Sequence, residues 1–304
     1  MKQIVCLFSL LFLMACSGSD SDKPAVSDAL PDDSAQLRIA VMPTIDCLPV
    51  YLAAEHGFFE KVGINVSLYD YKAQMDCDTA IERGRVNAIV TDLVRAERMK
   101  ERSKLDLQYV TSTEAAWQLV SMRNARINQL RQLDNKAIAM TRFSATHLLS
   151  EYVVEQAKVQ PERVFFIQIN NVNVRLNMLQ NEILDALWLS EPQATDARNR
   201  QSKVLFDTRK SDFRFGVVAF RKSAATKKQV EAFTTAYNQA CDSINRFGVQ
   251  SYADILTRKC DATQQTIDSL PAQKFGHAAA PREADLKRAK DWLNKIKNDA
   301  HVEK

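Results

Sequence analysis

Residues 37–71 decide the fold class; they are LRIAVMPTIDCLPVYLAAEHGFFEKVGINVSLYDY. The first six residues form a short apolar run, which is typical of a buried strand. Residues 48–59 have helical periodicity, with Pro49 tolerated in the first turn and with Gly57 and Gly63 around the end. Residues 64–71 alternate as a strand does. This stretch predicts a strand, a helix and a second, parallel strand joined by a right-handed crossover.

The same alternation continues along the chain and then repeats. In the first unit we expect strands at 88–91 and 107–111 and helices at 79–83 and 94–101. In a second unit we expect strands at 137–140, 164–169, 186–189 and 204–207 and helices at 145–157 and 174–179. A strand at 217–220 leads into a long amphipathic helix, 227–247, and a mostly helical remainder. The pattern predicts an α/β protein with two lobes, each a mainly parallel sheet flanked by helices.

The first residues indicate export. Lys2 precedes an apolar stretch, 4–14, that fits a secretory signal and is too short to span a bilayer. It ends in Leu13-Met14-Ala15-Cys16, which resembles the lipobox of bacterial lipoproteins. We therefore expect residues 1–15 to be removed, Cys16 to carry acyl chains such as palmitate, and residues 16–36 to form a flexible tether. The alternative is an ordinary signal peptide with an incidental Cys16.

Composition narrows the class of protein. The 304 residues are 46% hydrophobic and 26% charged, an ordinary globular balance with room for two lobes. The net charge of +4 comes from basic residues spread along the chain, so we expect no nucleic-acid binding. Only 7 glycines are present, and no glycine-rich phosphate loop appears among them. We expect no cofactor.

Three local motifs resemble a known family. They are Gly57-Phe58-Phe59-Glu60-Lys61-Val62-Gly63-Ile64, Glu182-Ile183-Leu184-Asp185-Ala186 and Leu189-Ser190-Glu191-Pro192. They resemble periplasmic solute-binding proteins of ABC transporters of the sulfonate and thiamine-precursor type, within the type 2 periplasmic-binding-protein fold. One departure is the absence of the usual glycine before the Asp-Ala pair.

The resemblance implies a hinge of two crossing segments and a ligand cleft between the lobes. We expect residues 37–121 and 223–304 to form lobe 1, with the C-terminal helices, and residues 122–222 to form lobe 2. The implied partners are a small-molecule ligand, an ABC permease in the inner membrane, and a membrane reached through lipidated Cys16. The folded part is expected outside the cytoplasm, in the bacterial cell envelope, as a monomer.

Ligands of open parallel sheets bind beyond the carboxyl ends of the strands, which selects candidate residues. Each candidate has an alternative structural role. Asp46 could cap a helix, Asp92 could cap a helix or pair with Arg95, and the tryptophans could belong to the core. Arg142 opens a helix and would favour an anion, or it could be a solvated arginine. The candidates are Thr44, Asp46, Asp76, Asp92, Trp117, Arg142, Ser144, Thr146, Asn173, Trp188 and Glu191.

The cysteines left after export form an even set. Disulfides are the default outside the cytoplasm, and chain order favours Cys47 with Cys77 and Cys241 with Cys260. Asp46-Cys47 and Asp76-Cys77 are matching dipeptides at two strand ends, which places the first pair within bridging range. The alternative, a metal held by both thiolates and aspartates, lacks the tight spacing of a zinc site, so no metal is expected.

The leading functional hypothesis is capture without chemistry for an importer. The acidic, aromatic candidates with one arginine favour a flat nitrogen heterocycle or an amine, with or without an acidic group. This set suits a thiamine-precursor pyrimidine or an amine more than a bare sulfonate, although a sulfonate stays among the possible ligands. The alternatives are an enzyme on the same fold acting on a small heterocycle and a ligand sensor. No nucleophile–base pair stands out, so no catalytic residue is assigned.

Overall fold

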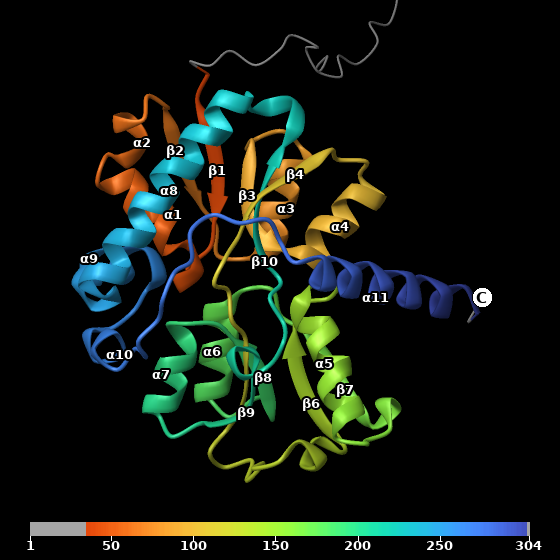
Figure 1. Ribbon diagram of the computed structural model, residues 1–304. Coiled ribbons are helices and arrows are strands. Elements are labelled where there is room, and N and C mark those ends of the chain that lie inside the picture. Colours follow the sequence, from red (N-terminus) through yellow and green to blue (C-terminus); the bar gives the residue numbers. More distant parts are fainter. Residues whose placement is uncertain (1–34, 303–304) are drawn as a thin grey trace, which may run out of the picture.

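The structure, a computed structural model, describes residues 35–302 and contains two five-stranded sheets, one above the other in Figure 1. The first sheet has the strand order β2-β1-β3-β10-β4. Its strands are β1 (Leu37–Val41), β2 (Val66–Asp70), β3 (Ala88–Asp92), β4 (Leu107–Ser112) and β10 (Gly216–Arg221). Strands β2, β1 and β3 are parallel, and β10 runs antiparallel to both β3 and β4. The predicted signal peptide and Cys16 lie outside the described residues.

The second sheet repeats this plan, with the order β7-β6-β8-β5-β9. Its strands are β5 (Gln118–Ser121), β6 (Lys136–Met140), β7 (Val164–Gln168), β8 (Ala186–Leu189) and β9 (Lys203–Asp207). Strands β7, β6 and β8 are parallel, and β5 is antiparallel to β8 and β9. The expected two-lobe α/β fold is confirmed.

Helices cover both sheets, and the C-terminal helices pack mainly on the first lobe (Figure 1). The α-helices are α1 (Leu48–Glu55), α2 (Phe58–Lys61), α3 (Gln74–Glu82), α4 (Leu93–Arg102), α5 (Ala145–Gln156), α6 (Val172–Gln180), α7 (Gln193–Asn199), α8 (Lys227–Phe247), α9 (Ala253–Cys260), α10 (Gln264–Asp268) and α11 (Glu283–Val302). Short 3-10 helices are η1 (Ile45–Cys47), η2 (Leu130–Leu133), η3 (Pro161–Arg163), η4 (Thr208–Lys210), η5 (Lys222–Ala224) and η6 (Val249–Tyr252). No helix in residues 35–302 combines the length and apolar character needed to cross a membrane.

Helix α8 shows how the sequence pattern becomes packing. A capping box of Thr226 and Gln229 starts it, and its apolar face is buried. The Phe233 ring on that face stacks on the Phe59 ring, with centroids 5.6 Å apart, and meets the Phe220 ring edge-on at 5.0 Å. These contacts fasten α8 to α2 and to strand β10, so the long helix belongs to the first lobe.

The chain crosses between the sheets at residues 113–117 and 208–215. Strand β5 therefore pairs in the second sheet, although residues 37–121 were expected in lobe 1. Strand β10 pairs in the first sheet, although residues 122–222 were expected in lobe 2. Both differences have one cause, which is that each crossing segment continues as an antiparallel strand of the sheet it enters. The four-residue strand β5 was too short to be found by periodicity.

The two predicted disulfides are wrong. Among the described residues, Cys47, Cys77, Cys241 and Cys260 are free and buried. Cys77 lies within helix α3 rather than in the loop after β2, so it does not share a loop edge with Cys47. Cys241 lies in the middle of α8 beside the Tyr237 hydroxyl, whereas Cys260 ends α9 beside Asp46. Burial raises the pKa of each thiol, which keeps them protonated.

Gly216, the first residue of β10, packs against the crossing segment 113–117. Its carbonyl accepts from the Thr113 amide at 2.9 Å, and a Cβ on Gly216 would lie only 2.5 Å from the Ala115 Cβ. The crossing therefore requires a residue without a side chain at this position.

We predict that Gly216→Ala lowers the free energy of unfolding by about 1–3 kcal/mol, because the methyl group has no space between two buried segments. Urea unfolding followed by circular dichroism measures this. Gly276→Ala is the matched control, since its Cβ would meet only the end of the flexible Glu114 side chain at 3.3 Å. It should change stability by less than about 0.5 kcal/mol. Equal effects of the two substitutions would contradict the packing argument.

Candidate functional site

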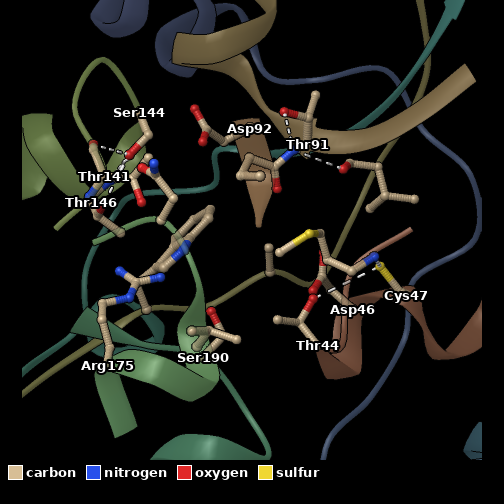
Figure 2. Close-up of a pocket in the computed structure, with 17 residues that line it drawn as sticks. Thr44, Asp46, Cys47, Thr91, Asp92, Thr141, Ser144, Thr146, Arg175 and Ser190 are labelled. Carbon is tan, nitrogen blue, oxygen red and sulfur yellow. Dashed lines mark hydrogen bonds between the residues drawn. The ribbon is translucent and has the colours of Figure 1, made fainter. Parts of the chain in front are cut away.

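A pocket lies between the lobes, with about 610 Å³ of empty space that is partly open to solvent (Figure 2). Both sheets contribute the residues that follow their strands, as expected for this architecture. The lining residues are Met42, Thr44, Asp46, Cys47, Gln74, Val90, Thr91, Asp92, Ala115, Trp117, Thr141, Ser144, Thr146, Asn170, Val172, Arg175 and Ser190.

Asp46 forms the first-lobe wall of the pocket. It lies in η1 directly after β1, and it is 7% exposed. Thr113 Oγ1 donates to its carboxylate at 3.2 Å. Burial raises the pKa of Asp46, and hydrogen bonds from Thr44 and Thr113 oppose the rise. Asp46 is thus a buried acceptor that two hydroxyl groups of its own lobe help to stabilise.

Asp92 connects the two lobes. It is the N-cap of α4, and its Oδ1 accepts from the Arg95 amide of that helix at 3.0 Å. The same atom accepts from the Ala145 amide, at the start of α5 in the other lobe, at 3.0 Å. One carboxylate therefore caps a helix on each side of the pocket. Burial raises the pKa of Asp92 to about 6, although Arg95 opposes the shift.

Hydroxyl groups surround the start of α5. Ser144 is its N-cap, and its Oγ accepts from the Thr146 amide at 3.1 Å and donates to the Thr141 carbonyl at 2.7 Å. Thr146 Oγ1 in turn accepts from the Thr141 amide at 3.0 Å. The threonines and the serine thus hold one another in place along the second-lobe wall.

Arg175 brings an unpaired positive charge to the pocket. It lies on α6, is 7% exposed, and points into the pocket from the second-lobe side in Figure 2. Its Nε and Nη1 atoms are buried without a hydrogen-bond partner, and no acidic side chain in residues 35–302 forms an ion pair with it. Burial alone lowers the pKa of Arg175 to about 10, so it stays charged at neutral pH. A buried cation without a partner favours the binding of an anion.

The structure brings part of the predicted set together. Trp117 is half-buried in the pocket wall, and its amide donates to Thr208 Oγ1 at 2.9 Å, which links the two crossing segments. The predicted residues that line the pocket are Thr44, Asp46, Asp92, Trp117, Ser144 and Thr146.

Five predicted residues lie elsewhere. Asp76 is exposed on the first turn of α3, and Arg142 is exposed outside the pocket. Asn173 donates to Asp261 at 2.8 Å and so joins α6 to the residue after α9. Trp188 is fully buried in the core, where its Nε1 donates to Ser150 Oγ at 2.8 Å. Side chains alternate between the two faces of a strand, which turns Trp188 into the core, and the helical period turns Asp76 and Asn173 away from the pocket.

Glu191 also belongs to the interior of the second lobe. It is 2% exposed, accepts from Gln118 Nε2 at 2.8 Å, and forms ion pairs with Arg198 at 2.9 Å and Arg209 at 3.4 Å. The Glu191 carboxylate is thus paired with side chains of its own lobe and does not face the pocket. Its backbone carbonyl accepts from the Ile45 amide at 2.8 Å, which fixes η1 against the second lobe.

Arg175 was missed because only the residues directly after each strand were considered. It is the fourth residue of α6, one turn beyond Asn171, the N-cap. A signal was present in the spacing, since Val172, Arg175 and Leu179 form the buried face of this helix. An arginine on an otherwise apolar face is the pattern to look for.

Comparison with known proteins agrees with this geometry. The family model described as NMT1/THI5 like matches residues 44–246, well over half of the chain. The chain belongs to the NMT1/THI5-like family. The expected family resemblance is thereby confirmed. No protein of curated function matches this NMT1/THI5-like chain.

Several solved structures share the fold of this NMT1/THI5-like protein. The alkanesulfonate-binding protein SsuA from Xanthomonas axonopodis pv. citri bound to MOPS has a TM-score of 0.72 and 15% identity, covering 89% of this chain and 95% of its own. The periplasmic aliphatic sulphonate binding protein SsuA from Escherichia coli has a TM-score of 0.70 and 16% identity. The match covers 86% of this chain and 87% of that protein. The periplasmic nitrate-binding protein NrtA from Synechocystis PCC 6803 has a TM-score of 0.66 and 10% identity. The match covers 78% of this chain and 69% of that protein. The TM-scores show a common fold.

The raised pKa of Asp92 predicts a pH dependence of stability. The ordinary value is 3.8 and the folded value is about 6, so between these pH values the folded protein binds the proton more tightly than the unfolded chain. The unfolding free energy of the wild type, relative to Asp92→Asn, should therefore rise by about 2 kcal/mol from pH 7.5 to pH 4.5. Asparagine keeps an oxygen acceptor and removes the charge. Parallel denaturation curves test this, and a pH-independent difference between the two proteins would contradict it.

Proposed function

We propose that the protein is the substrate-binding component of an ABC importer and that it captures a small solute between its lobes without chemical change. Hinged lobes that close on a ligand are the working parts of such proteins. In support, no histidine lines the described pocket, and its thiol, Cys47, is kept neutral by burial. His147 lies outside the pocket against Trp292, and burial lowers its pKa to about 4.

The observation that carries the proposal is the unpaired guanidinium of Arg175. Leaving a charged group buried without a partner costs free energy that the folded protein has to supply. A ligand with a sulfonate, carboxylate or phosphate group would give Arg175 its missing partner through charge-assisted hydrogen bonds. The sulfonate-binding and nitrate-binding proteins that share the fold agree with an anionic ligand.

The opposite wall calls for a different chemical group. Asp46 and Asp92 are buried acceptors, and Figure 2 shows Asp46 across the pocket from Arg175. A ligand that fits both walls carries an acidic group for Arg175 and an ammonium or N–H group for Asp46. Trp117 adds a flat apolar surface. An amino-substituted sulfonate or carboxylate, or an aminopyrimidine with an acidic group, meets these requirements.

The location follows from the N-terminal sequence. We propose that Cys16 is acylated, that residues 1–15 are removed, and that a tether holds a monomeric binding protein at a membrane outside the cytoplasm. The expected permease partner would receive the ligand from the closed lobes.

A Cys16→Ala variant should appear in the soluble envelope fraction instead of the membrane pellet, as seen by fractionation and blotting, with Cys6→Ala as control. Membrane retention of Cys16→Ala would contradict the anchor.

Arg175→Met separates the ligand-binding role from a structural one. Removing an unpaired buried charge should raise the free energy of unfolding of the ligand-free protein by about 1–3 kcal/mol. The same change should weaken ligand binding at least a hundredfold. Calorimetry against a panel of amino-sulfonates, acidic aminopyrimidines, plain sulfonates and plain amines measures the second effect.

The control for this experiment is Arg131→Met, which changes an exposed arginine in η2. It should leave binding unchanged and stability within about 0.5 kcal/mol. Loss of several kcal/mol of stability in Arg175→Met would assign a structural role to the guanidinium. Equal binding of plain amines by the wild type and by Arg175→Met would overturn the proposed ligand class.

A further inference from the structure

A second, wider cavity runs along the outside of the lobe boundary, next to the pocket. It has about 980 Å³ of empty space, which includes space open to solvent. Helices α3 and α4 of the first lobe and the loop between β6 and α5 of the second lobe form its walls. We call it the arginine groove, after the arginines that line it: Arg95, Arg98, Arg102 and Arg142.

Three of these arginines form one stripe on α4. Arg95, Arg98 and Arg102 are three and four residues apart, so they lie on the same face of the helix. Like charges at this spacing repel one another, and Arg95 also lies near the positive end of the helix dipole. Partial burial lowers the pKa of Arg98, and the charges of Arg102 and Arg95 lower it further. The stripe therefore concentrates positive charge, and the repulsion between these arginines lowers the stability of the ligand-free protein.

The acidic side chains of the groove do not neutralise it. Asp78 forms an ion pair with Arg95, which is 3% exposed, and Glu82 accepts from Ser103 Oγ at 2.6 Å. Arg98, Arg102 and Arg142 have no acidic side chain within ion-pair distance in the part of the chain that the structure describes. Two positive charges are thus left in excess of the acidic ones.

The second lobe contributes a constrained loop to the groove. Phe143 has a φ of +54°, in the left-handed region that a bulky residue seldom adopts. Its ring lies 4.1 Å from the guanidinium carbon of Arg98, a cation–π contact across the lobe boundary. Phe143 follows Arg142, so the same loop adds another arginine to the groove. The groove thus takes its lining from both lobes.

We propose that the arginine groove is a second anion-binding site, separate from the pocket, for a multiply charged oxyanion of the phosphate type. Arg98 and Arg102 would hold it from the first lobe and Arg142 from the second. Planar guanidinium groups suit phosphate oxygens, and several of them together suit a multivalent anion. This site does not depend on the identity of the pocket ligand.

Closure of the lobes follows from this geometry. An anion held by both lobes binds the closed arrangement more tightly than the open one, and so shifts the population toward it. By linkage, the same anion raises the affinity of the pocket for its own ligand. The groove would thus couple the concentration of an external oxyanion to solute capture.

The experiment is calorimetric titration of the full folded protein with pyrophosphate, at constant ionic strength, in four variants. We expect saturable binding at one site in the wild type. Binding should weaken at least tenfold in Arg98→Gln/Arg142→Gln and at least threefold in Arg102→Glu, which changes only an exposed side chain. Arg131→Gln, the control, should bind as the wild type does.

Arg175→Met distinguishes the groove from the pocket. Pyrophosphate binding retained in Arg175→Met supports the groove, whatever becomes of the proposed pocket ligand. The proposal is overturned if Arg175→Met alone abolishes pyrophosphate binding. It is equally overturned if Arg98→Gln/Arg142→Gln and Arg102→Glu, folded by circular dichroism, bind as tightly as the wild type.

Discussion

The two lobes of this protein are joined beside the pocket by one carboxylate oxygen that serves two helices. Asp92 Oδ1 accepts the first free amide of α5 in one lobe while it caps α4 in its own. The pocket lies beside this contact, and the arginine groove begins one helical turn further along α4. Residues 92–102 and 141–146 therefore contribute side chains to both cavities. An N-terminus already occupied by a protein carboxylate is less available to an anion from solution.

Because the start of α5 is already capped by Asp92, we expect Arg175, and not the helix amides, to bind an anion. Many helix starts bind anions through their amides alone, but here Asp92 and Ser144 already accept from the Ala145 and Thr146 amides of α5. The guanidinium of Arg175 is the unused donor in the pocket. With Asp46 opposite, the pocket separates positive from negative charge over a short distance. Such a pocket favours a ligand with two ends of different chemistry, rather than a simple anion.

Strand ends were predictable from the sequence, whereas side-chain directions were not. Asp46, Asp92 and Ser144 follow apolar runs that predict buried strands, and all three line the pocket. Trp188 comes from an equally clear strand, yet it points into the core. A shift of one residue along a strand reverses the face, so short strands leave this choice to packing. The helical residue Arg175 required knowledge of which face α6 turns toward the cleft.

The sequence by itself determined the alternation of strands and helices, the two-lobe α/β class and the family motifs, because these depend on local periodicity and turn residues. Only the tertiary structure decided where the chain crosses between sheets, since β5 and β10 pair with strands far away in sequence. It also decided that Cys77 lies within α3, apart from Cys47, and that Arg175 is left without a partner. Strand pairing between distant residues and the burial of side chains decide these features, and a local sequence pattern contains neither.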